Sequence, residues 1–230
     1  MNTAIVVAAG SGKRFNSTIP KQFLEILGKP LLIYTLERFE RCDSVSEVIL
    51  VLSSAEIANF TNIAGKFDIR KITKIVSGGM TRAESVFNGF RAVNPGVEII
   101  AVHDGARPLV SVDEISRTME KARETGAACL VADVTDTIKT IDGDRFAGTL
   151  DRRKLKRALT PQAFRYEILQ KAFALGYLGD DVTDECFLVE KLGYKIAFVE
   201  GNPKNIKITR PEDLVFAEAV LKDELYVSKK

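Results

Sequence analysis

Positively charged side chains gather around a glycine-rich turn near the N-terminus. The apolar run at residues 4–7 leads into Ala8-Ala9-Gly10-Ser11-Gly12-Lys13-Arg14, and Lys21 follows inside a Pro-Lys-Gln segment. Small residues and glycines let backbone N–H groups approach a ligand closely, and such groups favour an anion. This composition suits a triphosphate, but it also suits a solvated basic loop, so the turn alone leaves both interpretations open.

The turn does not match the two best-known glycine-rich phosphate motifs. The pattern GxGxxG would need glycine at position 15, where the chain has Phe15. The pattern GxxxxGK[ST] would need glycine at position 7 and Ser or Thr at position 14, where Val7 and Arg14 stand. These mismatches disfavour a hydride-transfer enzyme and an ordinary ATPase.

A second charged group, His103-Asp104-Gly105-Ala106-Arg107, directly follows the apolar run at residues 98–102. Asp104 is the candidate metal ligand, because Mg²⁺ binds to few carboxylates together with phosphate oxygens. Arg107 would bind phosphate or orient Asp104. His103 is the only histidine. We expect it to pack or hydrogen-bond beside Asp104 rather than act as a base, since a phosphate nucleophile is already ionised near neutral pH.

A third charged group lies near the C-terminus, where a strand-like stretch precedes Pro211. Lys207 alternates with the apolar Ile206 and Ile208, so on an extended chain it would point away from the core. Pro211 suits the first position of a helix. The plain alternative is a helix start with Thr209 as its cap, without any role in binding.

Short β-branched runs alternate with helix-length amphipathic segments. We expect strands at residues 4–7, 48–52, 72–76, 98–102, 127–131 and 195–199, and helices at residues 31–41, 81–93, 111–124, 166–174, 184–192 and 211–221. This order predicts an α/β fold with a mainly parallel sheet covered by helices on both faces. Such a sheet binds ligands outside the carboxyl ends of its strands, where the first two charged groups fall.

Residues 134–157 interrupt this alternation. Residues 137–141 alternate polar and apolar side chains, Asp142-Gly143-Asp144 is a turn pattern, and residues 146–150 can return as a second strand. We therefore predict a single domain over residues 1–230 with a projecting β-arm at 134–157. An isolated hairpin is marginally stable in water, so we expect the arm to pack on a second subunit; the alternative is that it folds back on its own domain.

The amino-acid composition limits the kinds of partner and the cellular location that we expect for this chain. Lys plus Arg number 33 and Asp plus Glu number 31, and this near-balance argues against nucleic acid as the main partner. The three cysteines form no closely spaced pair, which argues against a zinc site and a disulfide framework and fits a reducing compartment. Without an unbroken apolar run of about 18 residues, we expect no membrane span and a cytoplasmic protein.

Taken together, the motifs resemble the family of 2-C-methyl-D-erythritol 4-phosphate cytidylyltransferases of the non-mevalonate isoprenoid pathway. The resemblance spans nearly the whole chain. Its landmarks include Ala8-Ala9-Gly10, Pro20-Lys21-Gln22, Gly78-Gly79-x-x-Arg82-x-x-Ser85, His103-Asp104-x-Ala106-Arg107-Pro108, Asp136-Thr137-x-Lys139, Asp151-Arg152, Thr160-Pro161-Gln162, Thr183-Asp184 and Asn205-Ile206-Lys207. It implies a Rossmann-like fold of the nucleotide-diphospho-sugar transferase type and a homodimer with a swapped β-arm.

The resemblance also implies a reaction, in which the phosphate of a sugar alcohol attacks the α-phosphorus of CTP with Mg²⁺ or another divalent cation. Arg14 and Lys21 would stabilise the transition state, and Asp104 would hold the metal. Lys207 and the partner's arm, through its copy of Arg152, would position the acceptor. The implied nucleotide contacts are Ala8, Ala9, Gly10, Gly12, Gly79, Ser85 and Arg107; the implied substrate contacts are Thr137, Arg152, Thr160, Thr183 and Lys207.

Three alternatives stay open at this point. A ribitol 5-phosphate cytidylyltransferase would share most of the landmarks. A sugar-nucleotide glycosyltransferase often carries an Asp-x-Asp motif, which Asp142-Gly143-Asp144 matches, although turn chemistry explains that string at a hairpin tip. The last alternative is a noncatalytic nucleotide-binding module, against which the presence of Arg14, Lys21, Asp104 and Lys207 together argues.

Overall fold

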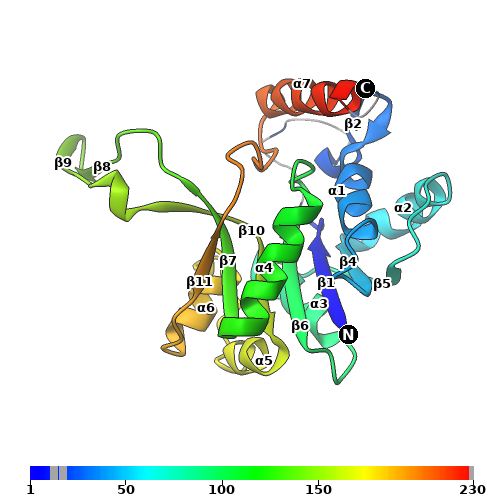
Figure 1. Cartoon of the computed structure of the whole chain (residues 1–230), viewed down its shortest axis with the longest axis horizontal. Helices are drawn as coiled ribbons and strands as arrows, with labels where there is room; N and C mark the ends of the chain where they lie inside the picture. The colour runs from blue at the N-terminus through cyan, green and yellow to red at the C-terminus, as the bar shows by residue number, and fades with distance from the viewer. Residues whose placement is uncertain (11–14, 16–19, 228–230) are drawn as a thin grey trace.

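The computed structural model describes residues 1–10, 15 and 20–227 of the chain. Its centre is a seven-stranded sheet with the strand order β11-β7-β10-β6-β1-β4-β5 (Figure 1). The strands are β1 (Asn2–Val7), β4 (Glu47–Leu52), β5 (Ile72–Ser77), β6 (Ile99–Asp104), β7 (Ala127–Asp133), β10 (Lys156–Arg165) and β11 (Ala197–Glu200). Only β10 runs antiparallel to its neighbours within this sheet. The expected α/β fold with a mainly parallel sheet is confirmed.

Alternating side chains along the strands divide the core into two layers. In β4, Val48 and Leu50 pack in one layer, whereas Ile49 and Val51 pack in the other, as the two-residue period of a strand requires. The first layer lies under α1 (Leu31–Glu40), α2 (Ile57–Ala64) and α4 (Val112–Thr125). The second lies under α3 (Arg82–Arg91), α5 (Tyr166–Ala174) and α6 (Glu185–Lys191).

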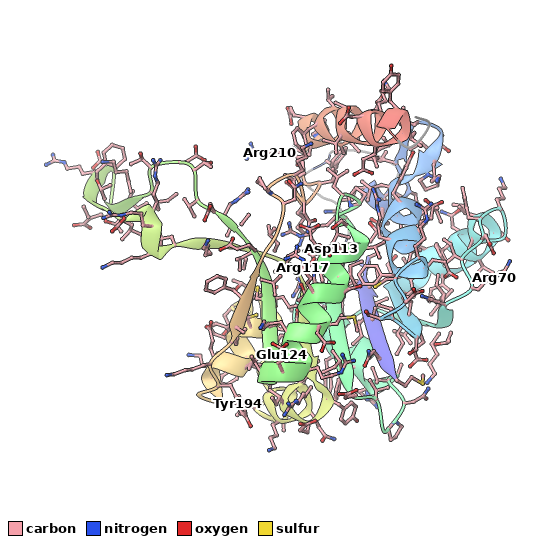
Figure 2. All side chains as sticks on the ribbon, in the orientation of Figure 1. Arg70, Asp113, Arg117, Glu124, Tyr194 and Arg210 are labelled. Carbon is pink, nitrogen blue, oxygen red and sulfur yellow. The ribbon has the colours of Figure 1, made fainter. Side chains whose placement is uncertain are left out.

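Local sequence explains where the helices α3 and α4 begin. The N-cap of α3 is Thr81, whose hydroxyl accepts the N–H of Glu84 in a capping box, and Ser111 caps α4 in the same way through Glu114. The outward face of α4 is polar, with exposed side chains that include Asp113, Arg117 and Glu124 (Figure 2). Capping thus fixes the start of each helix, while its apolar face anchors it to the sheet.

The C-terminal helix α7 (Pro211–Val227) lies across the carboxyl ends of the parallel strands (Figure 1). Ala217 and Leu221 of α7 belong to a small apolar cluster with Leu31, Tyr34 and Ile208. The short strands β2 (Glu25–Ile26) and β3 (Lys29–Pro30) pair beside it. This third cluster fixes the segment before α7, which carries Lys207, against the edge of the sheet.

The predicted β-arm is a hairpin of β8 (Lys139–Asp142) and β9 (Arg145–Thr149) that projects away from the rest of the molecule (Figure 1). Its residues are exposed, including the apolar Ile141 (72%) and Phe146 (77%). The turn at its tip contains Gly143 with a φ of 58°. At the base, Lys156 and Arg157 already pair with β7 in the main sheet, so the projecting part ends two residues earlier than predicted.

β10 and α2 were not predicted from the sequence. β10 begins with two basic residues and contains Pro161, and its pairing with β7 is interrupted between Ala158 and Gln162. Because of these features, the sequence of β10 lacks the usual strand pattern, although β10 pairs on both sides within the sheet. The last helix also extends beyond its expected end, to Val227.

Among the described residues, none of the helices combines the length and apolar character that a membrane span requires.

Candidate active site

A cavity of about 460 Å³ opens at the carboxyl edge of the parallel strands. Its volume falls in the range of about 300–1,000 Å³ that is usual for small-molecule sites. The lining residues come from strand ends and the segments after them: Val7, Ala8, Ala9, Gly10, Lys21, Gln22, Gly79, Met80, Thr81, Arg82, Ser85, Asp104, Ala106, Lys207 and Thr209. The three charged groups singled out in the sequence therefore each contribute to one cavity.

One wall of the cavity is made of small residues in tight contact. A Cβ on Gly78 would lie 2.3 Å from the Cβ of Ala9 and 2.8 Å from the Oγ of Ser85. The Ser85 hydroxyl accepts the N–H of Gly79 at 3.0 Å and donates to the carbonyl of Thr81 at 2.9 Å. Larger side chains would push these segments apart, so this wall requires residues of small size. By contrast, a Cβ on Gly10 would meet nothing within 4 Å.

Lys21 joins the first charged group to the third. It begins the short 3-10 helix η2 (Lys21–Phe23) directly after Pro20. Its ammonium donates to the carbonyl oxygen of Ile208 at 3.0 Å. This bond fixes the Lys21 side chain beside the segment that carries Lys207, although 186 residues separate the two lysines in the sequence.

Asp104, the last residue of β6, lies at the centre of the charged groups with 6% of its surface exposed. Its Oδ2 accepts from the Nζ of Lys207 at 3.0 Å and the Nε of Arg107 at 3.3 Å. Its Oδ1 accepts from the Nε of Arg82 at 3.2 Å. Burial alone would raise the pKa of Asp104, but the charges of Arg82, Lys207 and Arg107 outweigh it and hold the pKa far below its usual range. Asp104 is thus an anion at any working pH.

Two further charged residues complete the site. The terminal nitrogens of Arg82 donate to both carboxylate oxygens of Glu185, at 2.8 and 3.1 Å. Burial lowers the pKa of Arg82, yet the carboxylates of Glu185 and Asp104 more than compensate, so it is raised. Neither residue was assigned a role from the sequence. Arg82 stood in a family landmark, but its pairing with Glu185, 103 residues away, arises because the fold brings the first residues of α3 and α6 together.

His103 and Thr160 form a buried chain of hydrogen bonds beneath Asp104. The backbone N–H of Asp104 donates to the Thr160 hydroxyl at 3.2 Å, and this hydroxyl contacts Nδ1 of His103 at 3.0 Å. Nε2 of His103 contacts the carbonyl of Arg107 at 3.2 Å. Since that carbonyl can only accept, Nε2 carries a proton and Nδ1 accepts from Thr160. Burial lowers the pKa of His103 to about 4, so the ring is neutral near pH 7.

This chain shows the expected packing of His103 beside Asp104. It also places the Thr160 hydroxyl, on a residue only 3% exposed, inside its own subunit. The expected contact of Thr160 with an acceptor across a dimer stays an untested prediction. The position found here favours an indirect role, in which Thr160 fixes the backbone of Asp104.

The remaining predicted residues lie outside the cavity wall or outside the described residues. Arg107 lies behind Asp104 and donates to the carbonyl of Asn205 at 2.8 Å. Thr137 and Arg152 belong to the projecting arm, where Arg152 donates to the carbonyl of Thr135 at 2.6 Å. Thr183 lines a separate cavity of about 350 Å³. Gly12 and Arg14 lie outside the described residues, so the structure does not place them.

The fold and the cavity together define an α/β protein of the nucleotide-diphospho-sugar transferase type, with positively charged side chains at the carboxyl edge of its sheet. A family model described as 2-C-methyl-D-erythritol 4-phosphate cytidylyltransferase matches residues 2–223. A protein of that name from Geobacillus kaustophilus is 43% identical over 222 residues, which cover 95% of this chain and 96% of the relative. Its counterpart from Clostridium botulinum (strain Langeland) is 41% identical over 222 residues, covering 96% and 97%.

Comparison with solved structures supports the same family. The 4-diphosphocytidyl-2C-methyl-D-erythritol synthase of Anaerococcus prevotii superposes with a TM-score of 0.84 at 31% identity and covers 96% of each chain. The 2-C-methyl-D-erythritol 4-phosphate cytidylyltransferase of Thermus thermophilus superposes with a TM-score of 0.75 at 32% identity, covering 96% of this chain and 100% of that one. The chain belongs to the 2-C-methyl-D-erythritol 4-phosphate cytidylyltransferase family. The predicted family is confirmed, and the ribitol phosphate alternative is not favoured.

Proposed function

We propose that this chain transfers the cytidylyl group of CTP to 2-C-methyl-D-erythritol 4-phosphate, producing the 4-diphosphocytidyl derivative and pyrophosphate. Family membership supports this reaction. The structural observation that carries it is the convergence of Lys21, Lys207 and Asp104 on one cavity at the edge of the sheet.

The chemistry explains why cations dominate this cavity. An oxygen of the acceptor phosphate attacks the α-phosphorus of CTP, the bond from that phosphorus to the bridging oxygen breaks, and pyrophosphate leaves with the electron pair. Both reactants are anions, so positioning and charge stabilisation matter more than proton transfer. Lys21 and Lys207 supply positive charge within the cavity, and we assign the same role to Arg14. His103 is buried and neutral, and the acceptor phosphate requires no base.

The chemistry of the donors at Asp104 fits Mg²⁺. Among the described residues, Asp104 is the one carboxylate that lines the cavity, and no group of three or more His, Cys, Asp or Glu side chains forms a closed metal cage. Mg²⁺ takes one or two carboxylates and fills its other positions with phosphate oxygens and water. We propose that Asp104 holds Mg²⁺, which when bound supplies neutralising charge to the triphosphate.

The small-residue wall suits the nucleoside part of CTP. Ala8, Ala9 and Gly10 present backbone rather than bulky side chains to the cavity, and the space beside Gly10 is open. Gly79 and Ser85 line the cavity as part of the same small-residue wall. We propose that CTP lies along these residues, with its phosphates directed toward Lys21 and Asp104.

The exposed arm supports a homodimer. Ile141 and Phe146 carry apolar surface on a two-stranded hairpin, which is marginal in water unless something covers it. We propose that a second copy of the chain covers it, and that Arg152 and Thr137 from the partner arm contact the acceptor. Mixing Arg152→Ala chains with Lys207→Ala chains should then restore activity, because some mixed dimers contain one intact site. Mixed dimers that stay inactive, while each variant folds, would refute the shared site.

The state of the cysteines supports a cytoplasmic location. Cys42, Cys129 and Cys186 are free and buried. Free thiols without a structural disulfide fit a reducing compartment. We therefore retain the cytoplasm as the proposed site of the reaction.

The decisive experiment follows pyrophosphate release from CTP, Mg²⁺ and a panel of alditol phosphates. The proposed function predicts turnover with 2-C-methyl-D-erythritol 4-phosphate and little with ribitol 5-phosphate. It also predicts dependence on CTP, with ATP and UTP as controls. Equal turnover with both acceptors would contradict the acceptor assignment, and CTP binding without pyrophosphate release would favour a noncatalytic module.

A further inference from the structure

A buried carboxylate behind the cavity is connected to Asp104 through a single arginine. Glu185 is fully buried, with 0% of its surface exposed, at the first position of α6. Its two oxygens accept the two terminal nitrogens of Arg82 at 2.8 and 3.1 Å. The remaining donor nitrogen, Nε, reaches Oδ1 of Asp104 at 3.2 Å. Arg82 therefore links one carboxylate outside the cavity wall to one that lines it.

The Glu185 end of this link is itself fixed. The side-chain oxygen of Gln162, on β10, accepts the backbone N–H groups of Glu185 and Cys186, both at 3.1 Å. The amide nitrogen of Gln162 donates to Asp184 at 2.9 Å, and Asp184 caps α6 through the N–H of Phe187. The position of Glu185 is thus set by the hydrogen bonds from β10 and by the capping of α6.

We propose that Glu185 is a positioning residue for the transfer reaction and acts through Arg82. By accepting one N–H from each terminal nitrogen, Glu185 fixes the plane of the Arg82 guanidinium and so directs Nε at Asp104. Asp104 then keeps Oδ2 directed at Lys207, at 3.0 Å. This inference rests on the proposed function, because its catalytic consequence concerns the same cavity.

The physical need for Glu185 follows from what Arg82 would do without it. A guanidinium prefers to bind a carboxylate or phosphate through two parallel hydrogen bonds. Released from Glu185, Arg82 would engage both oxygens of Asp104 or turn its terminal nitrogens to the triphosphate in the cavity that it lines. Either change retains CTP but disturbs Asp104, and misplacement by about 1 Å can cost about 100-fold in rate.

The test compares Glu185→Gln with the wild type in two assays. We expect the kcat of Glu185→Gln to fall by about 10- to 100-fold. Equilibrium affinity for CTP without divalent cation, measured by calorimetry, should stay equal or become tighter. The matched control is Glu190→Gln, an exposed glutamate on the same helix, which should change neither quantity.

A double-mutant cycle separates action through Arg82 from general loss of structure. If Glu185 acts through Arg82, then adding Glu185→Gln to an Arg82→Gln background should lower kcat little further. Should Glu185→Gln fail to fold, Arg82→Lys replaces it, because a lysine keeps the charge but cannot bond both carboxylates in this geometry. We expect Arg82→Lys to show the same loss of kcat with retained CTP affinity.

Three results would overturn the inference: an unchanged kcat in Glu185→Gln, losses of kcat that simply multiply in the double variant, or CTP affinity that falls in step with kcat. The last pattern would mark Glu185 as merely structural. If the wild-type chain released no pyrophosphate, the proposed function would fail. The calorimetric comparison would then still decide whether Glu185 restrains Arg82.

Discussion

Replacing Lys207 by methionine removes one charge from the cavity and keeps a long side chain in place. The ion pair from Lys207 to Asp104 spans 3.0 Å, and the lysine side chain is 33% exposed. Asp104 would keep Arg82 and Arg107 as partners, at 3.2 and 3.3 Å. The lysine end of this pair is partly exposed, and because Arg82 and Arg107 still pair with the buried carboxylate, loss of the pair should cost about 1 kcal/mol of stability. We therefore expect Lys207→Met to fold, with a free energy of unfolding close to that of the wild type.

The expected loss in turnover is much larger. Removing one preorganised cationic donor from a charge-stabilising site costs about 10²–10³ in kcat, or about 3–4 kcal/mol at about 1.4 kcal/mol for each factor of ten. Because Lys207 is assigned to the acceptor phosphate, the KM for that acceptor should rise more than the KM for CTP. The gap between a small change in stability and a large change in rate is what makes the variant informative.

The assay measures pyrophosphate release while each substrate is varied, and urea unfolding follows the stability of the same preparations. The matched control is Lys204→Met, which removes an exposed lysine three residues away in the same segment. Lys204→Met should keep wild-type turnover. A Lys207→Met variant that retains nearly full kcat, or one that loses rate only in proportion to folded protein, would refute the role assigned to Lys207.

Two further predictions concern residues next to the cavity. Stability should fall as the pH drops from 6.5 toward 4, by up to about 3 kcal/mol, because burial lowers the pKa of His103 to about 4 and the unfolded chain takes up the proton first. Urea unfolding at pH 7 and pH 4.5 checks this, and His103→Gln should flatten the dependence. Gly78→Ala should weaken CTP binding in calorimetry, since its Cβ would lie 2.3 Å from Ala9, whereas Gly65→Ala, with nothing within 4 Å, should bind normally.

The topology of a parallel sheet made one part of the candidate site predictable from the sequence. The carboxyl ends of parallel strands meet at one edge, so residues after β1 and β6 had to lie near each other. This rule brought Ala8 and Asp104 together without any knowledge of side-chain contacts. The placement of Lys21 and Lys207 depended on the family resemblance, because nothing in local spacing fixes the loops that carry them.

The remaining parts escaped prediction because they depend on pairings between distant segments. β10 enters the sheet antiparallel, between β6 and β7, and its sequence of basic residues and a proline gave no apolar run to mark it. That strand contributes Thr160 to the support of Asp104 and Gln162 to the start of α6. Because this strand was missed, the supporting roles of Thr160 and Gln162 behind the cavity were missed with it.

The site that we assign to anionic ligands includes two carboxylates, and their positions show how these carboxylates fit that role. Arg82, Arg107 and Lys207 would repel one another if left unpaired beside a cavity. Asp104 contacts all three, and Glu185 binds the terminal nitrogens of Arg82, so these ion pairs hold the three cations at fixed positions. Three positive and two negative charges leave a positive excess in this group, to which Lys21 adds. Fixed charges need no rearrangement during reaction, which is the condition under which electrostatic stabilisation of a transition state is strongest.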